Sequence, residues 1–176
     1  NTDVRIGVTT ATGEIGKTGW EQLLPVLANW ASHERATVRT SVAHTLRQTA
    51  SEDLRRDDIL ALMQKWQSNT NPMFRWTVAA TLERLYPYMP DEAVQTLRAL
   101  AADTDSSVRG AVAHALAAIA RRDLEDVLSL IDEWIFDQDV SRRRTAANAF
   151  LRITGETRRG QMLIRGPEAR ARALPV

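Results

Sequence analysis

Residues 105–116 read DSSVRGAVAHAL, and the pattern of this stretch recurs along the chain. Its arginine belongs to a series spaced 34, 36, 34 and 34 residues apart: Arg5, Arg39, Arg75, Arg109 and Arg143. In the last four copies, an alanine stands four residues after the arginine and a large apolar residue seven residues after it. Nine residues before it stands Trp30, Trp66, Leu100 or Trp134. Such a period is the signature of a repeat architecture.

Each repeat has the pattern of two helices, here called helix A and helix B. Helix A has apolar residues at spacings of three and four and ends near the Trp or Leu position. A polar turn then leads to Asn71, Asp105 or Asp139, whose side chains are suited to cap helix B. Because one such pair cannot bury its apolar face alone, we predict an all-α fold of stacked helix pairs, an α-solenoid.

The order of these residues (Asp or Asn, then Val-Arg, then Ala and Leu on a second helix) resembles HEAT-like repeats. These are solenoids of the armadillo class, and they include a shorter bacterial variety. The resemblance covers about residues 1–155 and implies a right-handed superhelix of about four and a half helix pairs. It also implies that the B helices line a concave binding face. The recurring tryptophan at the end of helix A departs from the plain HEAT pattern.

The chain divides into a repeat array and a C-terminal segment. We expect a half unit at residues 1–14, followed by full units at 15–50, 51–86, 87–120 and 121–155. Residues 156–176 follow the last unit and are rich in arginine, with glycine and proline breaks. We interpret them as a basic tail or as a cap over the last unit.

The composition argues against an enzyme. The chain has no cysteine and three histidines, so it offers no thiol nucleophile and little for a metal site. We therefore predict no catalytic residue, no cofactor and no metal. It also lacks an apolar run long enough for a membrane span and an apolar signal stretch, which favours a cytoplasmic protein. Because residue 1 is Asn and not Met, we expect a piece of a larger bacterial regulatory protein.

Charge is unevenly distributed along the chain. Residues 1–141 hold 14 Lys and Arg against 20 Asp and Glu, whereas residues 142–176 hold nine Arg against two Glu. The basic end suggests an acidic partner, nucleic acid or self-association.

One motif invites a different interpretation. Residues 11–18 read ATGEIGKT and satisfy a loose phosphate-loop pattern. However, residues 4–30 align without gaps on residues 108–134, which puts the glycine-lysine-threonine segment in the turn between helices B and A. No second apolar strand ending in an acidic residue follows to hold magnesium. We therefore do not predict a nucleotide site.

The repeated arginines are candidates for a structural ladder: Arg39, Arg75, Arg109 and Arg143. Asp103 and Asp137 lie six residues before the arginine of their units, and Asn69 holds the matching place in another unit. In the HEAT-like solenoids that this sequence resembles, such Asp and Arg residues commonly bond between adjacent repeats. We expect this stacking role, with a phosphate-binding ladder as the alternative.

Trp76 breaks the repeat. It directly follows the repeated arginine, where other units have Thr40, Gly110 or Arg144. At 100° per residue this position points away from the apolar stripe of helix B. We predict a partner-binding surface on successive B helices, with these candidate residues: Trp76, His44, Arg47, His114 and Arg144. The alternative is that Trp76 only fills a gap in the packing.

The leading hypothesis is a non-catalytic scaffold that binds a protein or peptide on the concave face of the B helices. One alternative is a nucleic-acid-binding module similar to the HEAT-like alkylpurine DNA glycosylases. The acidic charge of residues 1–141 argues against it, because non-specific DNA binding needs many phosphate contacts along one face. Another alternative is a sensor segment of a signalling NTPase.

Overall fold

The computed structural model describes residues 2–50 and 55–159, with side chains placed for residues 6–50 and 55–155. These residues form nine α-helices and no strand, so the predicted all-α fold is confirmed for this part of the chain. The helices are α1 Thr2–Thr18, α2 Trp20–Ala31, α3 Ala36–Ala50, α4 Arg56–Gln67, α5 Pro72–Leu85, α6 Pro90–Leu100, α7 Ser106–Ile119, α8 Leu124–Ile135 and α9 Val140–Arg159. Of the expected tail or cap at 156–176, residues 160–176 lie outside the described residues.

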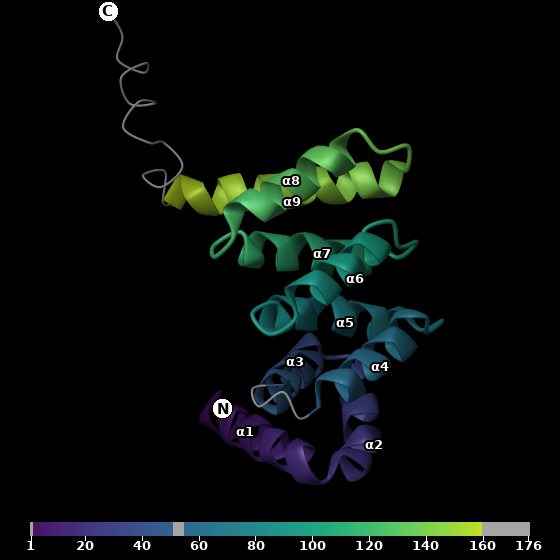
Figure 1. The fold of residues 1–176 in the computed structure, drawn as a ribbon, viewed down its shortest axis with the longest axis vertical. Helices are drawn as coiled ribbons and strands as arrows, with labels where there is room; N and C mark the ends of the chain where they lie inside the picture. Colours follow the sequence, from purple (N-terminus) through teal and green to yellow (C-terminus); the bar gives the residue numbers. More distant parts are fainter. Residues whose placement is uncertain (1, 51–54, 160–176) are drawn as a thin grey trace, which may run out of the picture.

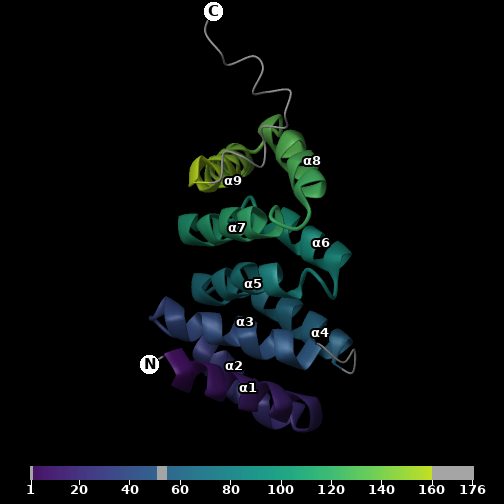
Figure 2. The same cartoon turned by 90° about the vertical axis from the view of Figure 1, so that its left-hand side faces the viewer.

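The helices stack in two layers. Helices α1, α3, α5, α7 and α9 contact one another in this order and form what we call the B layer. Helices α2, α4, α6 and α8 form the A layer, and each packs on the B-layer helix that follows it. Figure 2 shows α3, α5, α7 and α9 one above the other, with α4, α6 and α8 beside them. The first and last helices lie at opposite ends of the stack (Figure 1).

The repeated apolar positions form the core between the layers. Leu46, Leu82 and Leu116, seven residues after the repeated arginines, are at most 1% exposed. Trp66 and Trp134 close the ends of α4 and α8 and are also buried. The tryptophans at the end of helix A are therefore mainly packing residues, as their fixed place in the repeat indicates.

The last unit leaves part of this pattern uncovered. Phe150 on α9 occupies the same repeat position as the buried leucines, yet it is 45% exposed. Leu151 is 65% exposed, and Ala147 is exposed as well. Within residues 55–155 no further helix pair packs on the far side of α9, so this apolar surface has no neighbour there.

Local capping explains where α5 and α7 begin. The side chain of Asn71 accepts a hydrogen bond from the backbone N–H of Met73, and Pro72 occupies the first turn of α5. Asp105 accepts from the N–H groups of Ser107 and Val108 at the start of α7. These side chains satisfy backbone donors that the helix itself leaves free.

Close packing of α1 on α3 accounts for the glycines of the phosphate-loop-like motif. A Cβ atom added to Gly13 would lie 2.5 Å from Cβ of Gln48, and one added to Gly16 would lie 2.5 Å from Oγ1 of Thr49. The glycines therefore let two helices approach each other. We placed residues 16–18 in a turn, but α1 continues through Thr18, so that prediction was wrong. A helix also cannot wrap its N–H groups around a phosphate, because they are already bonded within it.

Candidate functional site

The two layers carry opposite charge. The four A-layer helices hold nine Asp and Glu against three Lys and Arg. In the B layer, α3, α5, α7 and α9 up to residue 155 hold nine Arg against one acidic residue, Glu83. Within residues 1–141, α3, α5 and α7 hold five of these arginines, so the acidic overall charge of that part of the chain hides a basic B layer. Sequence counting missed it because helices of the two layers alternate along the chain.

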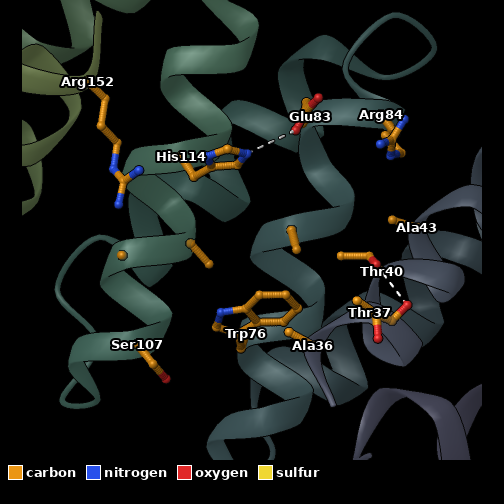
Figure 3. A pocket seen from close by; sticks show the side chains of 13 residues that line it. Ala36, Thr37, Thr40, Ala43, Trp76, Glu83, Arg84, Ser107, His114 and Arg152 are labelled. Carbon is orange, nitrogen blue, oxygen red and sulfur yellow. Dashed lines mark hydrogen bonds and ion pairs between the residues drawn. The ribbon is translucent and has the colours of Figure 1, made fainter. Parts of the chain in front are cut away.

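A groove of about 460 Å³ lies on the B layer, between α3, α5, α7 and α9. Small residues of adjacent helices, including Ala43, Ala80, Gly110 and Ala111, line it and leave it open. Because an added Cβ at Gly110 would meet no atom within 4 Å, this part of α7 borders open space. Larger side chains, among them Trp76, border the same space (Figure 3).

Trp76 is half-buried and packs partly against the core. The guanidinium carbon of Arg39 lies 4.3 Å from the centroid of the indole ring, which is a cation–π contact between α3 and α5. Burial of this guanidinium lowers the pKa of Arg39. Trp76 therefore fills space beside α3 and also lines the groove, and its role in binding a partner stays a prediction.

Charged side chains border the groove away from Trp76. Nε2 of His114 on α7 lies 4.0 Å from Oε2 of Glu83 on α5, which is an ion pair when the histidine is protonated. Arg84 contributes from α5, and Arg152 extends from α9 toward α7 (Figure 3). Among the described residues, neither Arg84 nor Arg152 has a hydrogen-bond or ion-pair partner.

A second hollow, of about 310 Å³, adjoins the groove. It is lined by Arg47, Arg84, Arg121 and Arg122, together with Ala118 and Glu83. Glu83 and Arg84 line both the groove and the hollow, so the two are neighbours on the B layer, and we call them together the depression.

The structure brings only some of the predicted binding residues together. Trp76 and His114 line the groove, and Arg47 lines the adjoining hollow. His44 is half-buried and Arg144 is exposed, and neither lines the groove or the hollow. That these residues bind a partner stays a prediction.

The repeated arginines bind the turn that precedes their own helix. In each case Nη1 donates to two backbone carbonyl oxygens, five and six residues earlier, at distances between 2.5 and 3.0 Å. The four arginines are Arg39, Arg75, Arg109 and Arg143. The constant spacing within a unit thus reflects a contact inside the unit, which fixes the turn between helix A and helix B.

The predicted ion pair between units is present at one junction. Nε and Nη2 of Arg75 donate to the two carboxylate oxygens of Asp103, at 2.6 and 2.9 Å. This hydrogen bonding raises the pKa of Arg75. Asp137 instead accepts from Arg142 of its own unit at 2.6 Å. We had expected Asp137 to pair with the repeated arginine of the preceding unit, but it pairs with Arg142, which lies in its own unit.

Buried threonines form links between units that sequence analysis missed. The hydroxyl of Thr77 on α5 donates to the carbonyl oxygen of Ala31 at the end of α2, at 3.0 Å. The hydroxyl of Thr145 on α9 donates to the carbonyl oxygen of Ala101, at 2.8 Å. Both threonines stand two residues after the repeated arginine and are fully buried. The signal that could have identified them is a threonine that recurs at the same position on the apolar side of helix B.

The described residues show neither a metal site nor a membrane span. No group of three or more His, Cys, Asp or Glu side chains in that part of the chain is placed to hold a metal ion. None of the helices found there is long and apolar enough to cross a membrane.

Stacked helix pairs with capped B helices and a continuous core define an α-solenoid. A family model for HEAT repeats matches residues 59–152, which is more than half of the chain, and the chain belongs to this family. No curated protein and no solved structure matches it.

Proposed function

We propose that the chain is a non-catalytic scaffold that binds a segment of a partner protein along the B layer. The observation that carries this proposal is the open depression across α3, α5, α7 and α9, bordered by Trp76 and by the side chains of Arg47, Arg84, Arg122 and Arg152, which have no partner among the described residues. The B layer is the face that HEAT-like solenoids are expected to turn inward.

The composition of the depression supports binding over catalysis. A protein-binding surface gains most from a few large aromatic and arginine side chains surrounded by small neighbours. Trp76 and Arg84 are residues of these kinds, and the alanines and glycine around them leave room for a partner. General acid–base catalysis would need groups placed around a common reacting atom. His114 and Glu83 face each other at 4.0 Å, and among the described residues no other histidine or carboxylate lines the groove.

The test is to fill the groove without disturbing the fold. A random peptide library displayed on phage is selected against the protein, and the selected peptides are then measured against Gly110→Phe. The new ring should enter the groove, because a Cβ at Gly110 meets no atom within 4 Å. Gly7→Phe is the matched control, since its Cβ is equally open but lies on α1, outside the groove.

We expect selected peptides to lose at least tenfold in affinity with Gly110→Phe and less than twofold with Gly7→Phe. Peptides that bind both variants equally well, or a library that yields no binder, would refute the proposed function.

A further inference from the structure

We infer that the partner segment is acidic and carries an apolar or aromatic residue, with its carboxylates on the arginines of the depression and its apolar side chain beside Trp76. This inference rests on the proposed function, and it names the chemistry of the partner.

The charges of the depression are unbalanced. Arg47, Arg84, Arg122 and Arg152 line it, and within the described residues the side chain of none of them has a hydrogen-bond or ion-pair partner. Arg121 adds to the positive charge of the hollow, and Glu83 is the acidic residue that lines both depressions. A guanidinium group binds a carboxylate through two parallel hydrogen bonds. Several carboxylates on one segment would therefore neutralise a surface that the described residues leave positive.

The groove end of the depression is mainly apolar. One face of the Trp76 ring is covered by Arg39, and the side chain also packs against the core, which restricts its rotation. Ala80 and Ala111 provide small apolar walls in the same groove. A ring with restricted rotation beside small residues offers contact area for one apolar side chain at little cost in conformational entropy.

A peptide fits this surface better than a nucleic acid does. Glu83 lies among the cations, in both the groove and the hollow. A phosphodiester backbone carries negative charge at every residue and only hydrogen-bond acceptors, so it is repelled there. A peptide backbone has an N–H donor at nearly every residue and can bond to this carboxylate. In addition, strand-binding proteins stack successive bases on several aromatic rings, whereas Trp76 is the one Trp, Tyr or Phe that lines the groove in the described part of the chain.

The experiment compares three fluorescein-labelled probes by anisotropy at about 0.1 M salt. The first is a peptide of about twelve residues that alternates Glu with Gly and Ser around a central Phe-Leu. The second has Lys in place of each Glu, and the third is an oligothymidylate of the same length. Arg84→Glu with Arg152→Glu is the test variant, and Arg152→Glu alone is made because this residue is exposed. Lys65→Glu, at an exposed position of α4 in the other layer, is the control with the same change of charge per site.

We expect the glutamate peptide to bind the unchanged protein at least tenfold more tightly than the lysine peptide or the oligonucleotide. The double variant should lose at least tenfold in affinity for the glutamate peptide and bind the lysine peptide better than before. Arg152→Glu should lose at least threefold, and Lys65→Glu less than twofold.

Three outcomes would overturn the inference: equal binding of both peptides, tighter binding of the oligonucleotide, or no effect of either arginine variant. The display selection separates this failure from failure of the proposed function. Groove-dependent peptides without an excess of Asp and Glu would refute the acidic partner and leave the scaffold proposal standing. A selection without groove-dependent peptides would refute both.

Discussion

Replacing Arg75 with alanine should remove the ion pair that joins two units. Arg75 donates two hydrogen bonds to Asp103, and the side chains of the two residues are 14% and 7% exposed. Removing one partner of a buried pair leaves the other charge uncompensated, which costs about 3–5 kcal/mol. Because some exposure remains and Asp103 still accepts from the N–H of Asp105, we expect the lower end of this range, about 3 kcal/mol.

Arg109→Ala is the matched control. Arg109 makes the same two bonds to its own turn, but no carboxylate accepts from it within the described residues. Its loss should therefore cost only about 1–2 kcal/mol. The difference between the two variants isolates the contact between units from the contact inside a unit.

Unfolding in urea, followed by circular dichroism at 222 nm and by tryptophan fluorescence, measures both free energies. Asp103→Ala and the double variant with Arg75→Ala complete a cycle, in which we expect a coupling of about 2 kcal/mol. Equal losses for Arg75→Ala and Arg109→Ala, or a coupling near zero, would refute the assignment of this pair as a link between units.

Three further predictions concern packing and polar links, and urea unfolding measures each of them. Gly16→Ala should destabilise the fold by about 1–3 kcal/mol because its Cβ would overlap Thr49 on α3. Gly7→Ala should stabilise α1 by about 0.5–1 kcal/mol, because its Cβ meets no atom and alanine favours the helix. Changes in the free energy of unfolding that have the same sign for both variants would contradict the close packing of α1 on α3. Thr77→Val should cost about 1–2 kcal/mol by removing a bond to another helix, more than Thr81→Val, whose hydroxyl donates only within α5; the reverse order would argue against a link. Trp76→Ala should cost about 2 kcal/mol, less than the 3–5 kcal/mol typical of a fully buried aromatic, and a loss outside about 1–3 kcal/mol would contradict its half-buried place.

Much of the fold could be predicted because its signals are local in the sequence. Helix caps such as Asn71 and Asp105, and apolar residues at fixed offsets, act within one unit and recur in the next. The contacts of the repeated arginines with their own turns were not predicted, because backbone carbonyl oxygens leave no mark on the sequence. The spacing of the repeat predicted the pairing of Arg75 with Asp103. It predicted the same kind of pair for Asp137, which instead binds Arg142 of its own unit, and spacing alone does not distinguish the two cases.

The candidate site was predictable in part. Trp76 was recognised because it interrupts the repeat, and the structure places it on the groove. Arg84 and Arg152 were missed, although both stand nine residues after a repeated arginine. The matching residues in the other units are Gln48 and Ala118, so no column of like residues pointed to this position. A binding surface whose residues differ from unit to unit can be identified only in the three-dimensional structure.

The junctions between neighbouring units are not copies of one another. Hydroxyl groups join α1 to α3 through Thr12 and Thr45, and a cation over a ring joins α3 to α5. Ion pairs link the units of α5 and α7, and an ion pair between Arg98 and Glu133 together with a threonine hydroxyl links the unit of α7 to that of α9. The junctions therefore differ in the kind of contact that holds them, and the solvent acts on them unequally. Salt would weaken the last two junctions most, because they contain charge pairs, which ions screen. A bend imposed on the solenoid would then concentrate at the C-terminal junctions, and the curvature of the whole would change without any helix unfolding.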